Sequence, residues 1–438
     1  MPHCEAKRSR RAKRDPSGVG IASKYIQVYL KNYLKFSLVF LGMLIGIVGK
    51  PSTGKSTFFK AATLAEVDIA NYPFTTIKPN HAVGYVKIDC VDVEFNTQCN
   101  PRFGYCINHK RFVPVDLLDV AGLIEGASEG EGLGNQFLDD LNQADALIHV
   151  IDLAGMTNAR GESVEAGSYD PANDIRFLER ELDLWYLRIL KKGWEKFSRT
   201  IKQEGSDISK AIAKQMSGLR VDEDLAKEVI KKLELSEKID TWSEDELMSL
   251  ASILRNRTKP MIIAANKADI SVAYENFERL KKEFPEYVII ACSADSEVAL
   301  KSAAKKGMID YVPGNNDFND LGKLNEGQKN ALNFIKENVL NKYNSTGVQD
   351  VLDKVVFDIL KMVAIFPGGV NKLEDKDGNV LPDCFLMKSG TTALDFAYRL
   401  HSSIGDGFIR AIDVKTKRTV GKEHVLKNRD VVEIVAKA

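Results

Sequence analysis

The stretch Leu44-Ile-Gly-Ile-Val-Gly-Lys-Pro-Ser-Thr-Gly-Lys-Ser-Thr57 decides the fold of this chain. Within it, residues 49–56 fit the phosphate-loop pattern G-x-x-x-x-G-K-[ST]. The apolar run before the loop predicts a buried strand over 44–48, and the residues after it predict a helix over 56–64. Glycines let such a loop wrap closely around a phosphate, so that backbone N–H groups and the helix N-terminus face the anion. The stretch therefore predicts a binding site for a nucleoside triphosphate.

Two side chains of this stretch carry the predicted chemistry. Lys55 is expected to reach the β- and γ-phosphates, where it neutralises charge during hydrolysis, and the Ser56 hydroxyl is expected to ligate Mg²⁺. The predicted nucleotide contacts here are Gly49, Lys50, Pro51, Ser52, Thr53, Gly54, Lys55, Ser56 and Thr57.

Length and composition describe an ordinary soluble protein of several domains. A chain of 438 residues is long enough for about three domains, each with its own core. Lysine plus arginine and aspartate plus glutamate both number 61, so the total charge does not favour nucleic-acid binding, although a neutral total can hide a basic face.

The six cysteines do not form a disulfide framework, because their spacing is irregular. Cys90, Cys99, Cys106 and His109 lie around a predicted hairpin tip and could be read as a zinc site. No C-x-x-C pair occurs among them, and the spacing fits no familiar ligand pattern. We therefore expect reduced, partly buried thiols and a cytoplasmic protein.

The first 42 residues require a separate interpretation. Met1 to Arg14 is strongly basic and Phe36 to Val48 is apolar, which superficially resembles a signal sequence. The apolar run is too short to span a bilayer, and its second half is needed as the first strand. We expect either that Met43 is the true start or that residues 1–42 are a dispensable, largely disordered extension.

Two further segments have the features of nucleotide-sensing loops. Asn71 to Asn80 contains two prolines and a Thr-Thr pair, and we expect Thr76, or else Thr75, to complete the Mg²⁺ shell and contact the γ-phosphate. Asp119-Val-Ala-Gly122 follows a predicted strand over 112–118 that pairs in a long hairpin with residues 81–90. Asp119 is the expected second Mg²⁺ anchor and the Gly122 N–H the expected γ-phosphate donor, which gives Thr76 and Gly122 predicted catalytic roles.

The glycine-rich run from Gly122 to Gly134 predicts a second switch segment. Ras-type GTPases place a water-orienting glutamine after the first glycine, whereas this chain has Leu123. A leucine cannot polarise water. The sequence therefore predicts slow intrinsic hydrolysis or a catalytic group from elsewhere, such as a lysine, an arginine or a bound K⁺.

A highly charged helical region interrupts the nucleotide domain between about Met156 and Lys259. Its apolar residues recur at spacings of three and four, as in a heptad stripe, at Ile175, Leu178, Leu182, Trp185 and Ile189. Residues 208–219 suggest a returning helix, and Ser243-x-x-Glu246 a capping box that opens another. We predict an inserted helical, partly coiled-coil domain.

The base-specificity motif follows the next buried strand, residues 260–265, as Asn266-Lys-Ala-Asp269. The carboxyl ends of strands are where open α/β sheets bind ligands. Asp269 can accept hydrogen bonds from guanine N1–H and the 2-amino group, and mispairing with adenine would cost roughly 10⁴–10⁵ in selectivity. Lys267 is expected to cover the base, and Asn266 to tie this loop to the phosphate loop. The backbone of Ser293 and Ala294 could meet guanine O6.

The C-terminal residues 362–438 predict a separate small mixed β-sheet unit with a helix capped at Thr391 or Thr392. Its end is basic, at Lys415, Lys417, Arg418, Lys422, Lys427 and Arg429. These residues form either a solvated surface or an RNA contact through phosphate pairing.

Together these motifs resemble the Obg-related GTPases, specifically the YchF-type (Obg-like ATPase) branch in an archaeal-looking version. The resemblance is carried by residues 49–56, 72–80 and 119–123 and by Leu381-Pro through Leu394-Asp-Phe-Ala397, which match a TGS domain. It implies an α/β P-loop NTPase G domain with a mostly parallel sheet, a helical coiled-coil insertion and a C-terminal β-grasp TGS domain. The expected boundaries are 1–42 for the extension, 43–155 and 260–361 for the G domain, 156–259 for the insertion and 362–438 for TGS.

By implication the activity is Mg²⁺-dependent nucleotide hydrolysis and the partner is the ribosome, or its rRNA or tRNA, bound through the TGS domain and the helical arm. Better-known members of this branch have a degenerate base motif and prefer ATP, whereas residues 266–269 are intact here, so we predict GTP. We expect a cytoplasmic monomer that does not act at a membrane. The alternatives are an ATP-preferring hydrolase of the same fold and a non-catalytic RNA-binding adaptor gated by nucleotide.

Overall fold

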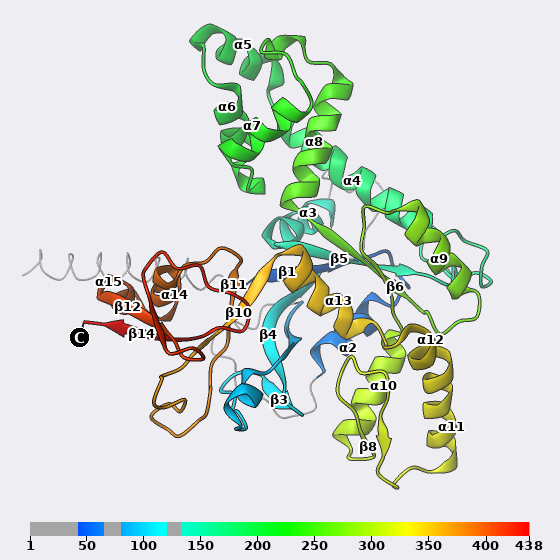
Figure 1. Ribbon diagram of the computed structural model, residues 1–438. Coiled ribbons are helices and arrows are strands. Elements are labelled where there is room, and N and C mark those ends of the chain that lie inside the picture. The colour runs from blue at the N-terminus through cyan, green and yellow to red at the C-terminus, as the bar shows by residue number, and fades with distance from the viewer. Residues whose placement is uncertain (1–42, 65–79, 121–132, 438) are drawn as a thin grey trace, which may run out of the picture. The chain divides into compact units, whose positions relative to one another are not determined.

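A mostly parallel sheet lies at the centre of the nucleotide domain (Figure 1). The computed structural model describes residues 43–64, 80–120 and 133–437. The sheet order is β2-β4-β1-β5-β6-β7, and β3 also pairs with β4. All pairs from β4 to β7 are parallel, whereas β2 and β3 pair antiparallel with β4. The strands are β1 (Leu44–Val48), β2 (His81–Asp89), β3 (Tyr105–Ile107), β4 (Lys110–Asp119), β5 (Ala146–Asp152), β6 (Met261–Asn266) and β7 (Ile289–Ala291).

Helices cover both faces of this sheet, which explains why its central strands are mostly apolar and why every residue of β5 and β6 is buried. One face packs on α2 (Lys55–Thr63), α10 (Ala294–Lys305) and α13 (Val348–Lys354) through a core that includes Ile45 and Phe58. The other face packs on α3 (Leu133–Gln143) and α9 (Ala273–Glu283). The predicted α/β architecture with a mostly parallel sheet is confirmed.

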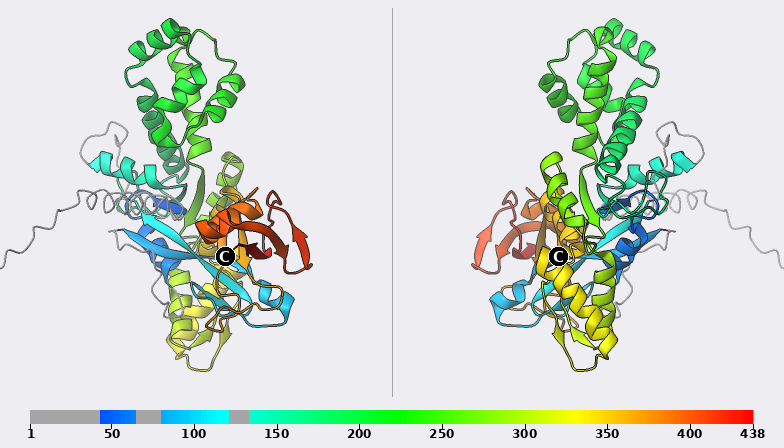
Figure 2. Two further views of the ribbon diagram at one scale, coloured as in Figure 1. Left: turned by 90° about the vertical axis from the view of Figure 1, so that its left-hand side faces the viewer. Right: turned by 90° about the vertical axis from the view of Figure 1, so that its right-hand side faces the viewer.

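The helical region between β5 and β6 consists of a long helix pair and a group of shorter helices. Helix α4 (Ala172–Lys191) packs along α8 (Glu244–Thr258). In Figures 1 and 2, α5 (Trp194–Glu204), α6 (Ile208–Gln215) and α7 (Glu223–Lys232) gather at one end of this pair. The predicted capping box of Ser243 and Glu246 begins α8.

One detail of the predicted insertion is wrong. Residues 208–219 were expected to form one returning helix, but α6 ends at Gln215 and a separate 3-10 turn follows at Ser217–Leu219; the main partner of α4 is α8. Ile175, Leu178 and Leu182 are buried in this contact. The length of α8 suits the apolar stripe of α4: the stripe from Ile175 to Ile189 makes about four turns, which the 15-residue α8 can cover and the eight-residue α6 cannot.

After α10 the chain forms a short hairpin of β8 (Ile309–Asp310) and β9 (Asn319–Asp320) and then returns to the sheet through further helices. These are α11 (Glu326–Ile335), α12 (Asn341–Tyr343), α13 and two π-helical turns at Lys336–Leu340 and Val355–Ile359.

The C-terminal unit has its own mixed sheet, in the order β11-β10-β14-β12-β13. Strand β10 (Met362–Pro367) pairs parallel with β14 (Val431–Ala436) and antiparallel with β11 (Phe385–Lys388). Strands β12 (Phe408–Asp413) and β13 (Arg418–Val420) complete it, and α14 (Ala393–Leu400) and α15 (Ser402–Asp406) cover it. Thr392 caps α14 with Asp395, as the sequence predicts.

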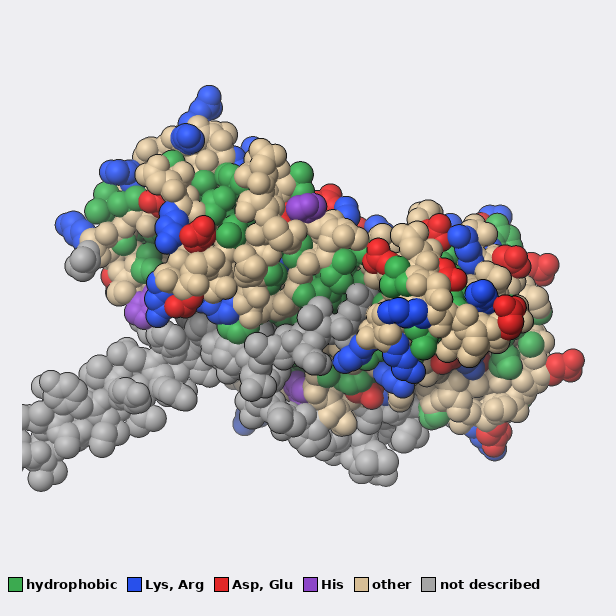
Figure 3. Space-filling model, turned by 90° about the horizontal axis from the view of Figure 1, so that it is seen from below, with side chains coloured by type: hydrophobic (Ala, Val, Ile, Leu, Met, Phe, Trp, Pro, Cys, Tyr) green, Lys and Arg blue, Asp and Glu red, His purple; other side chains and the backbone are tan. Residues whose placement is uncertain are grey.

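The charges on the surface are mixed, as expected from equal numbers of basic and acidic residues. On the face shown in Figure 3, basic and acidic side chains are interspersed. No helix in the described ranges has both the length and the apolar character needed to cross a bilayer.

Candidate functional site

The phosphate loop has a backbone that requires glycine at two positions. Gly54 immediately precedes α2 and has a φ of 85°, in the left-handed region. A Cβ at Gly54 would lie 2.2 Å from Asn266 Nδ2, and a Cβ at Gly49 would lie 2.5 Å from the carbonyl oxygen of Val150. The loop is therefore held against β5 and the base-specificity motif at van der Waals distance, which leaves no space for a side chain.

The predicted phosphate lysine and the predicted Mg²⁺ anchor meet at one point of the sheet. Strand β1 pairs with β4 so that Ile47 lies beside Asp119, which places the carboxylate next to the phosphate loop. Lys55 Nζ forms an ion pair with Asp119 Oδ1. Ser56 is exposed on the first turn of α2. A hydroxyl and a carboxylate on neighbouring elements are hard oxygen ligands of the kind that Mg²⁺ prefers, so this donor set fits the ion.

Four predictions lie outside the described residues. They are Thr75 and Thr76 of the first switch, and Gly122 and Leu123 of the second. The extension over residues 1–42 also lies outside this part of the chain.

Asn266 joins three loops by two hydrogen bonds. Its Nδ2 donates to the carbonyl oxygen of Thr53 at 2.9 Å, and its Oδ1 accepts from the N–H of Ala294 at 3.0 Å. All three residues are almost completely buried. The predicted tie between the base-specificity motif and the phosphate loop is therefore present, and it extends to the loop before α10.

Lys267 is positioned by a residue that the sequence analysis did not single out. Its Nζ lies 2.8 Å from Oδ2 of Asp152, whose side chain is fully buried at the end of β5. The same carboxylate accepts the Thr157 hydroxyl at 3.0 Å. Asp152 could have been found by the rule that selected Asp119, because it also follows a buried strand at the carboxyl edge of the sheet.

Asp269 is half-buried and faces the loop before α10, where the Ser293 hydroxyl donates to Oδ1 at 2.8 Å. The N–H groups predicted to meet guanine O6 are bonded within the protein: Ser293 N–H donates to Thr346 O at 2.9 Å and Ala294 N–H to Asn266. The N–H of Ala294 could therefore donate to guanine O6 only if it shared this hydrogen bond between O6 and Asn266 Oδ1, or gave up the bond to Asn266. The hydroxyl of Ser293 adds a contact that the sequence analysis did not foresee.

Lys50 belongs to the predicted nucleotide contacts, but its side chain faces the start of the helical insertion. Its Nζ lies 2.9 Å from Asp174 Oδ2, donates to Thr157 O at 2.8 Å and covers the ring of Tyr169. Burial lowers the pKa of Lys50, and Asp174 opposes that effect. The lysine can therefore serve a phosphate only through its backbone. Of the other loop residues, Pro51 and Ser52 are exposed, Thr53 is buried and Thr57 is half-buried.

The C-terminal end of α3 is held by two basic residues of the insertion. Lys259 is fully buried and its Nζ donates to the carbonyl oxygens of Asn142 at 2.7 Å and Ala144 at 2.5 Å. Arg220 donates to Gln143 O at 3.1 Å and pairs with Asp145. Cations at a helix C-terminus satisfy its last carbonyl groups and its dipole. These contacts join the C-terminal end of α3 to the insertion.

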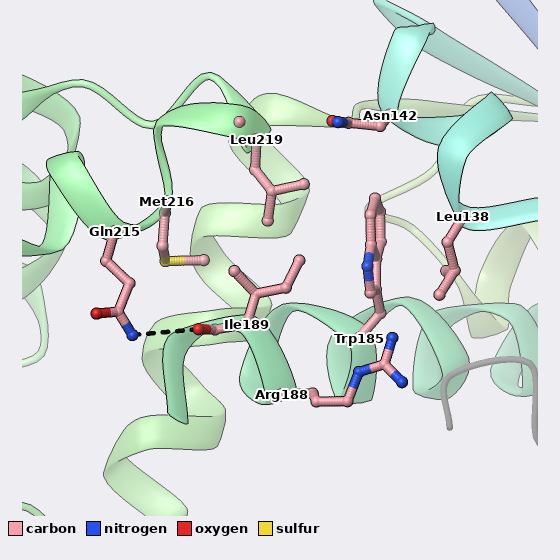
Figure 4. Close-up of a pocket in the computed structure, with 9 residues that line it drawn as sticks. Leu138, Asn142, Trp185, Arg188, Ile189, Gln215, Met216 and Leu219 are labelled. Carbon is pink, nitrogen blue, oxygen red and sulfur yellow. Dashed lines mark hydrogen bonds between the residues drawn. The ribbon is translucent and has the colours of Figure 1, made fainter. Parts of the chain in front are cut away.

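A hollow of about 280 Å³ lies between α3, α4 and α6, away from the phosphate loop. Figure 4 shows Trp185, Leu138 and Met216 on its walls and the hydrogen bond from Gln215 Nε2 to Ile189 O, which is 3.2 Å long. Asn142, Arg188 and Gln215 line it together with apolar side chains, and none of the predicted nucleotide contacts does. It is therefore a packing gap along the seam between α3 and the insertion.

Three segments of the chain match known families. Residues 44–178 match the family described as 50S ribosome-binding GTPase, and residues 264–369 match the Obg-like GTPase YGR210-like, G4 motif-containing domain. Residues 375–436 match the TGS domain. The three matches follow the order of the nucleotide domain and the C-terminal unit.

Individual relatives match over nearly their whole length. The uncharacterized GTP-binding protein MJ1332 of Methanocaldococcus jannaschii is 48% identical, over 90% of this chain and 99% of that protein. The ribosome-binding ATPase YchF of Bacillus subtilis is 28% identical, over 90% of this chain and 98% of that protein. A crystal structure of a GTP-binding protein from Pyrococcus horikoshii has a TM-score of 0.71 and 41% identity, and the match covers 90% of this chain and all of that one. By these matches and by its fold, the chain belongs to the YchF-type, Obg-like family of P-loop GTPases with a C-terminal TGS domain.

Proposed function

We propose that the protein is a Mg²⁺-dependent, GTP-binding and GTP-hydrolysing switch that acts on the ribosome. The observation that carries the proposal is the double hydrogen bond of Asn266, to Thr53 O at 2.9 Å and from Ala294 N–H at 3.0 Å. It holds the phosphate loop and the two predicted base-binding loops at one edge of the sheet. A site whose parts are joined in advance binds a nucleotide with less ordering cost.

The phosphate end of the site uses charge. Lys55 and Asp119 already lie in contact, and Ser56 is exposed beside them. Ser56 and Asp119 would hold Mg²⁺, which would neutralise charge on the β- and γ-phosphates, and Lys55 would turn from Asp119 to the phosphates. Thr76 and Gly122 are proposed to complete this end of the site.

The base end of the site favours guanine. Asp269 accepts the Ser293 hydroxyl on Oδ1, which fixes one oxygen of the carboxylate. A carboxylate can pair with two guanine donors, whereas adenine offers an acceptor and a C–H at these positions. The relative from M. jannaschii bears the name GTP-binding protein and the one from B. subtilis the name ATPase, so base preference is the first property to measure.

The switch is proposed to reach the helical insertion through α3. A change in the segment before α3 would move that helix, whose far end is held by Lys259 and Arg220 of the insertion. Packed elements with two arrangements can carry such a change over a distance. The insertion would then report the nucleotide state to the ribosome.

The ribosome is the proposed partner because a relative over nearly the whole length bears the name ribosome-binding ATPase. In the C-terminal unit, Lys417, Arg418, Lys422 and Lys427 are exposed, whereas Lys415 and Arg429 pair with Glu94. The four exposed cations could pair with rRNA phosphates. Action at the ribosome would place a monomeric protein in the cytoplasm.

Hydrolysis is proposed to be slow in the isolated protein, since Leu123 cannot orient a water molecule. Turnover of GTP should therefore rise when ribosomes or K⁺ supply the missing group. Equal turnover with and without both additions would contradict this part of the proposal.

The base preference is tested by titrating the full chain with fluorescent GDP and ADP analogues in Mg²⁺ buffer, each in competition with its unlabelled nucleotide. We expect strong preference for GDP. In Asp269→Asn, the amide would donate a hydrogen bond where the carboxylate accepted one. The affinity for GDP should therefore fall, and the affinity for xanthosine diphosphate, whose base has a carbonyl at C2, should rise. The exposed Asp310 in β8 supplies the control Asp310→Asn, which should bind GDP as the parent does. Equal binding of GDP and ADP would favour an ATPase of the same fold.

A further inference from the structure

Three cysteines and one aspartate converge at the end of β4 that is opposite to the nucleotide site. The reactive atoms of Cys90, Asp92, Cys99 and Cys106 all lie within 4.8 Å of one another. The Sγ atoms of Cys90 and Cys99 are 3.5 Å apart, and Sγ of Cys106 is 3.9 Å from Oδ2 of Asp92. We call these four residues the cysteine cluster.

The distances in the cysteine cluster are those of a tetrahedral metal site. Zn–S bonds of about 2.3 Å at tetrahedral angles place two sulfurs about 3.8 Å apart, and a Zn–O bond of about 2.0 Å brings a sulfur and an oxygen to about 3.5 Å. The observed sulfur–sulfur distance of 3.5 Å and sulfur–oxygen distance of 3.9 Å each lie within about 0.4 Å of the corresponding value. The four residues come from the end of β2, a 3-10 turn at Val91–Phe95, the following loop and β3, so the arrangement is a product of folding.

The backbone of the hairpin explains how ligands with such irregular spacing meet. Asn108 and His109 form a two-residue turn with φ of 49° and 59°, which pairs β3 directly with β4. Cys106 lies near Cys90 because β2 and β3 both pair with the first residues of β4: Asp89 lies beside Lys110, and Cys106 lies beside Arg111. The loop between the 3-10 turn at Val91–Phe95 and β3 supplies Cys99.

The carboxylate of the cluster is oriented by its neighbours. Asp92 is fully buried, accepts the N–H of Cys99 on Oδ2 at 3.1 Å and lies 3.0 Å from His109 Nδ1 on Oδ1. Carboxylates that bind metals are commonly held in place by hydrogen bonds of this kind.

A buried positive charge faces the thiols. Arg111 is 1% exposed, and its terminal nitrogens donate to Leu381 O at 3.0 Å and Pro382 O at 2.9 Å. Its Nε has no hydrogen-bond partner in the described part of the chain. Arg111 lies beside Cys106 in the pairing of β3 with β4, and a buried positive charge beside thiols suits thiolate ligands, the form that binds a soft metal.

We propose that the cysteine cluster is a structural zinc site, with Cys90, Cys99 and Cys106 as thiolate ligands and Asp92 as the fourth ligand. This changes our expectation from the sequence, where irregular spacing favoured free thiols. The site is independent of the nucleotide site, since the eight residue steps from Arg111 to Asp119 along β4 correspond to roughly 26 Å.

The position of the site indicates what the metal would stabilise. The loop that carries Cys99 donates from Asn100 N–H to Val380 O at 2.8 Å and from Arg102 N–H to Pro382 O at 2.9 Å. Arg102 also pairs with Asp375 at 2.7 Å. Zinc would fix this loop and with it the contact between the nucleotide domain and the segment before β11.

The test is the metal content of the full chain, purified without a metal-affinity tag and measured by mass spectrometry of the elements. We expect about one zinc per chain, and less than about a tenth in Cys99→Ser and in Cys106→Ser. Cys384→Ser is the matched control, because Cys384 is close enough to Cys99 to sense its charge but contributes no atom to the cluster, so its zinc content should equal that of the parent.

A second measurement keeps the proposal testable if the variants do not fold. Zinc is removed from the parent by a chelator under reducing conditions, and Co²⁺ is then titrated in. Thiolate-to-cobalt charge-transfer absorption that saturates at about one ion per chain would support the site. Absence of zinc together with absence of this absorption would overturn the proposal. So would a Cys90–Cys99 disulfide in protein prepared under the same reducing conditions.

Discussion

Replacing Asn266 by alanine tests whether the bridge between the three loops determines nucleotide binding. The change removes the donor to Thr53 O and the acceptor for Ala294 N–H, both in a region where Asn266 itself is 2% exposed. Each buried backbone group left without a partner costs about 1–3 kcal/mol, so the two together correspond to about 2–6 kcal/mol. The loss should divide between the stability of the nucleotide-free protein and the affinity for GDP, because GDP binding must then restore the spacing of the loops.

The assay measures both parts on the same preparations. The stability of the nucleotide-free protein is measured by urea unfolding, using the unfolding transition whose midpoint GDP shifts. The GDP affinity is measured by fluorescence titration. Asn276→Ala is the matched control, since Asn276 is half-buried and donates one hydrogen bond, to Leu153 O at 2.9 Å, away from the phosphate loop. It should cost about 1 kcal/mol in stability and leave the GDP dissociation constant within about twofold.

Two outcomes would refute the reasoning about Asn266. One is a combined loss below about 1 kcal/mol, which would mean that the two bonds contribute little. The other is an equal loss of GDP affinity in Asn276→Ala, which would mean that general loosening, and not the bridge, weakens binding.

Three further predictions concern single residues. Gly54→Ala should weaken GDP binding by about tenfold or more in the same titration, since the residue has a φ of 85° and its Cβ would lie 2.2 Å from Asn266 Nδ2; affinity within about twofold of the parent would contradict this. Burial raises the pKa of Asp353 to about 7, so between pH 4 and 7 the folded state binds more protons than the unfolded state. The free energy of unfolding should therefore fall with rising pH in this range, by up to about 4 kcal/mol. Asp353→Asn should abolish this pH dependence in urea unfolding measured at a series of pH values. Burial lowers the pKa of Lys259 to about 8, so between pH 8 and 10.5 the unfolded state binds more protons and stability rises with pH by up to about 3 kcal/mol; Lys259→Met should lose this rise, and an unchanged rise would show that another group causes it.

Much of the nucleotide domain could be predicted from local patterns. The strand, loop and helix around residues 44–63, the hairpin of β2 and β4 and the strand before Asn266 all follow from short runs of residue types. The capping boxes at Ser243 and Thr392 were equally local, because a cap involves residues three positions apart. The partner of α4 was not predictable in this way, since an apolar stripe indicates that a helix packs but not on which helix.

The candidate site shows the same division. Gly54, Lys55 and Asn266 could be selected because their roles depend on motif spacing. Asp152 was missed, and Lys50 was assigned to the nucleotide although Asp174 binds its side chain. In both cases the deciding contact joins residues more than 100 positions apart.

By itself, then, the sequence determined the order of the elements, the phosphate-loop motif and the family, because these depend on residues close together in the chain. Only the tertiary structure decided which side chains share a site. The parallel register of β1, β4, β5 and β6 brings Asp119, Asp152 and Asn266 to one edge. The turn at Asn108 and His109 brings Cys106 back to Cys90 and Cys99. Strand register and turn geometry place residues with irregular spacing in the chain close together in space. The spacing in the sequence does not show which residues these are.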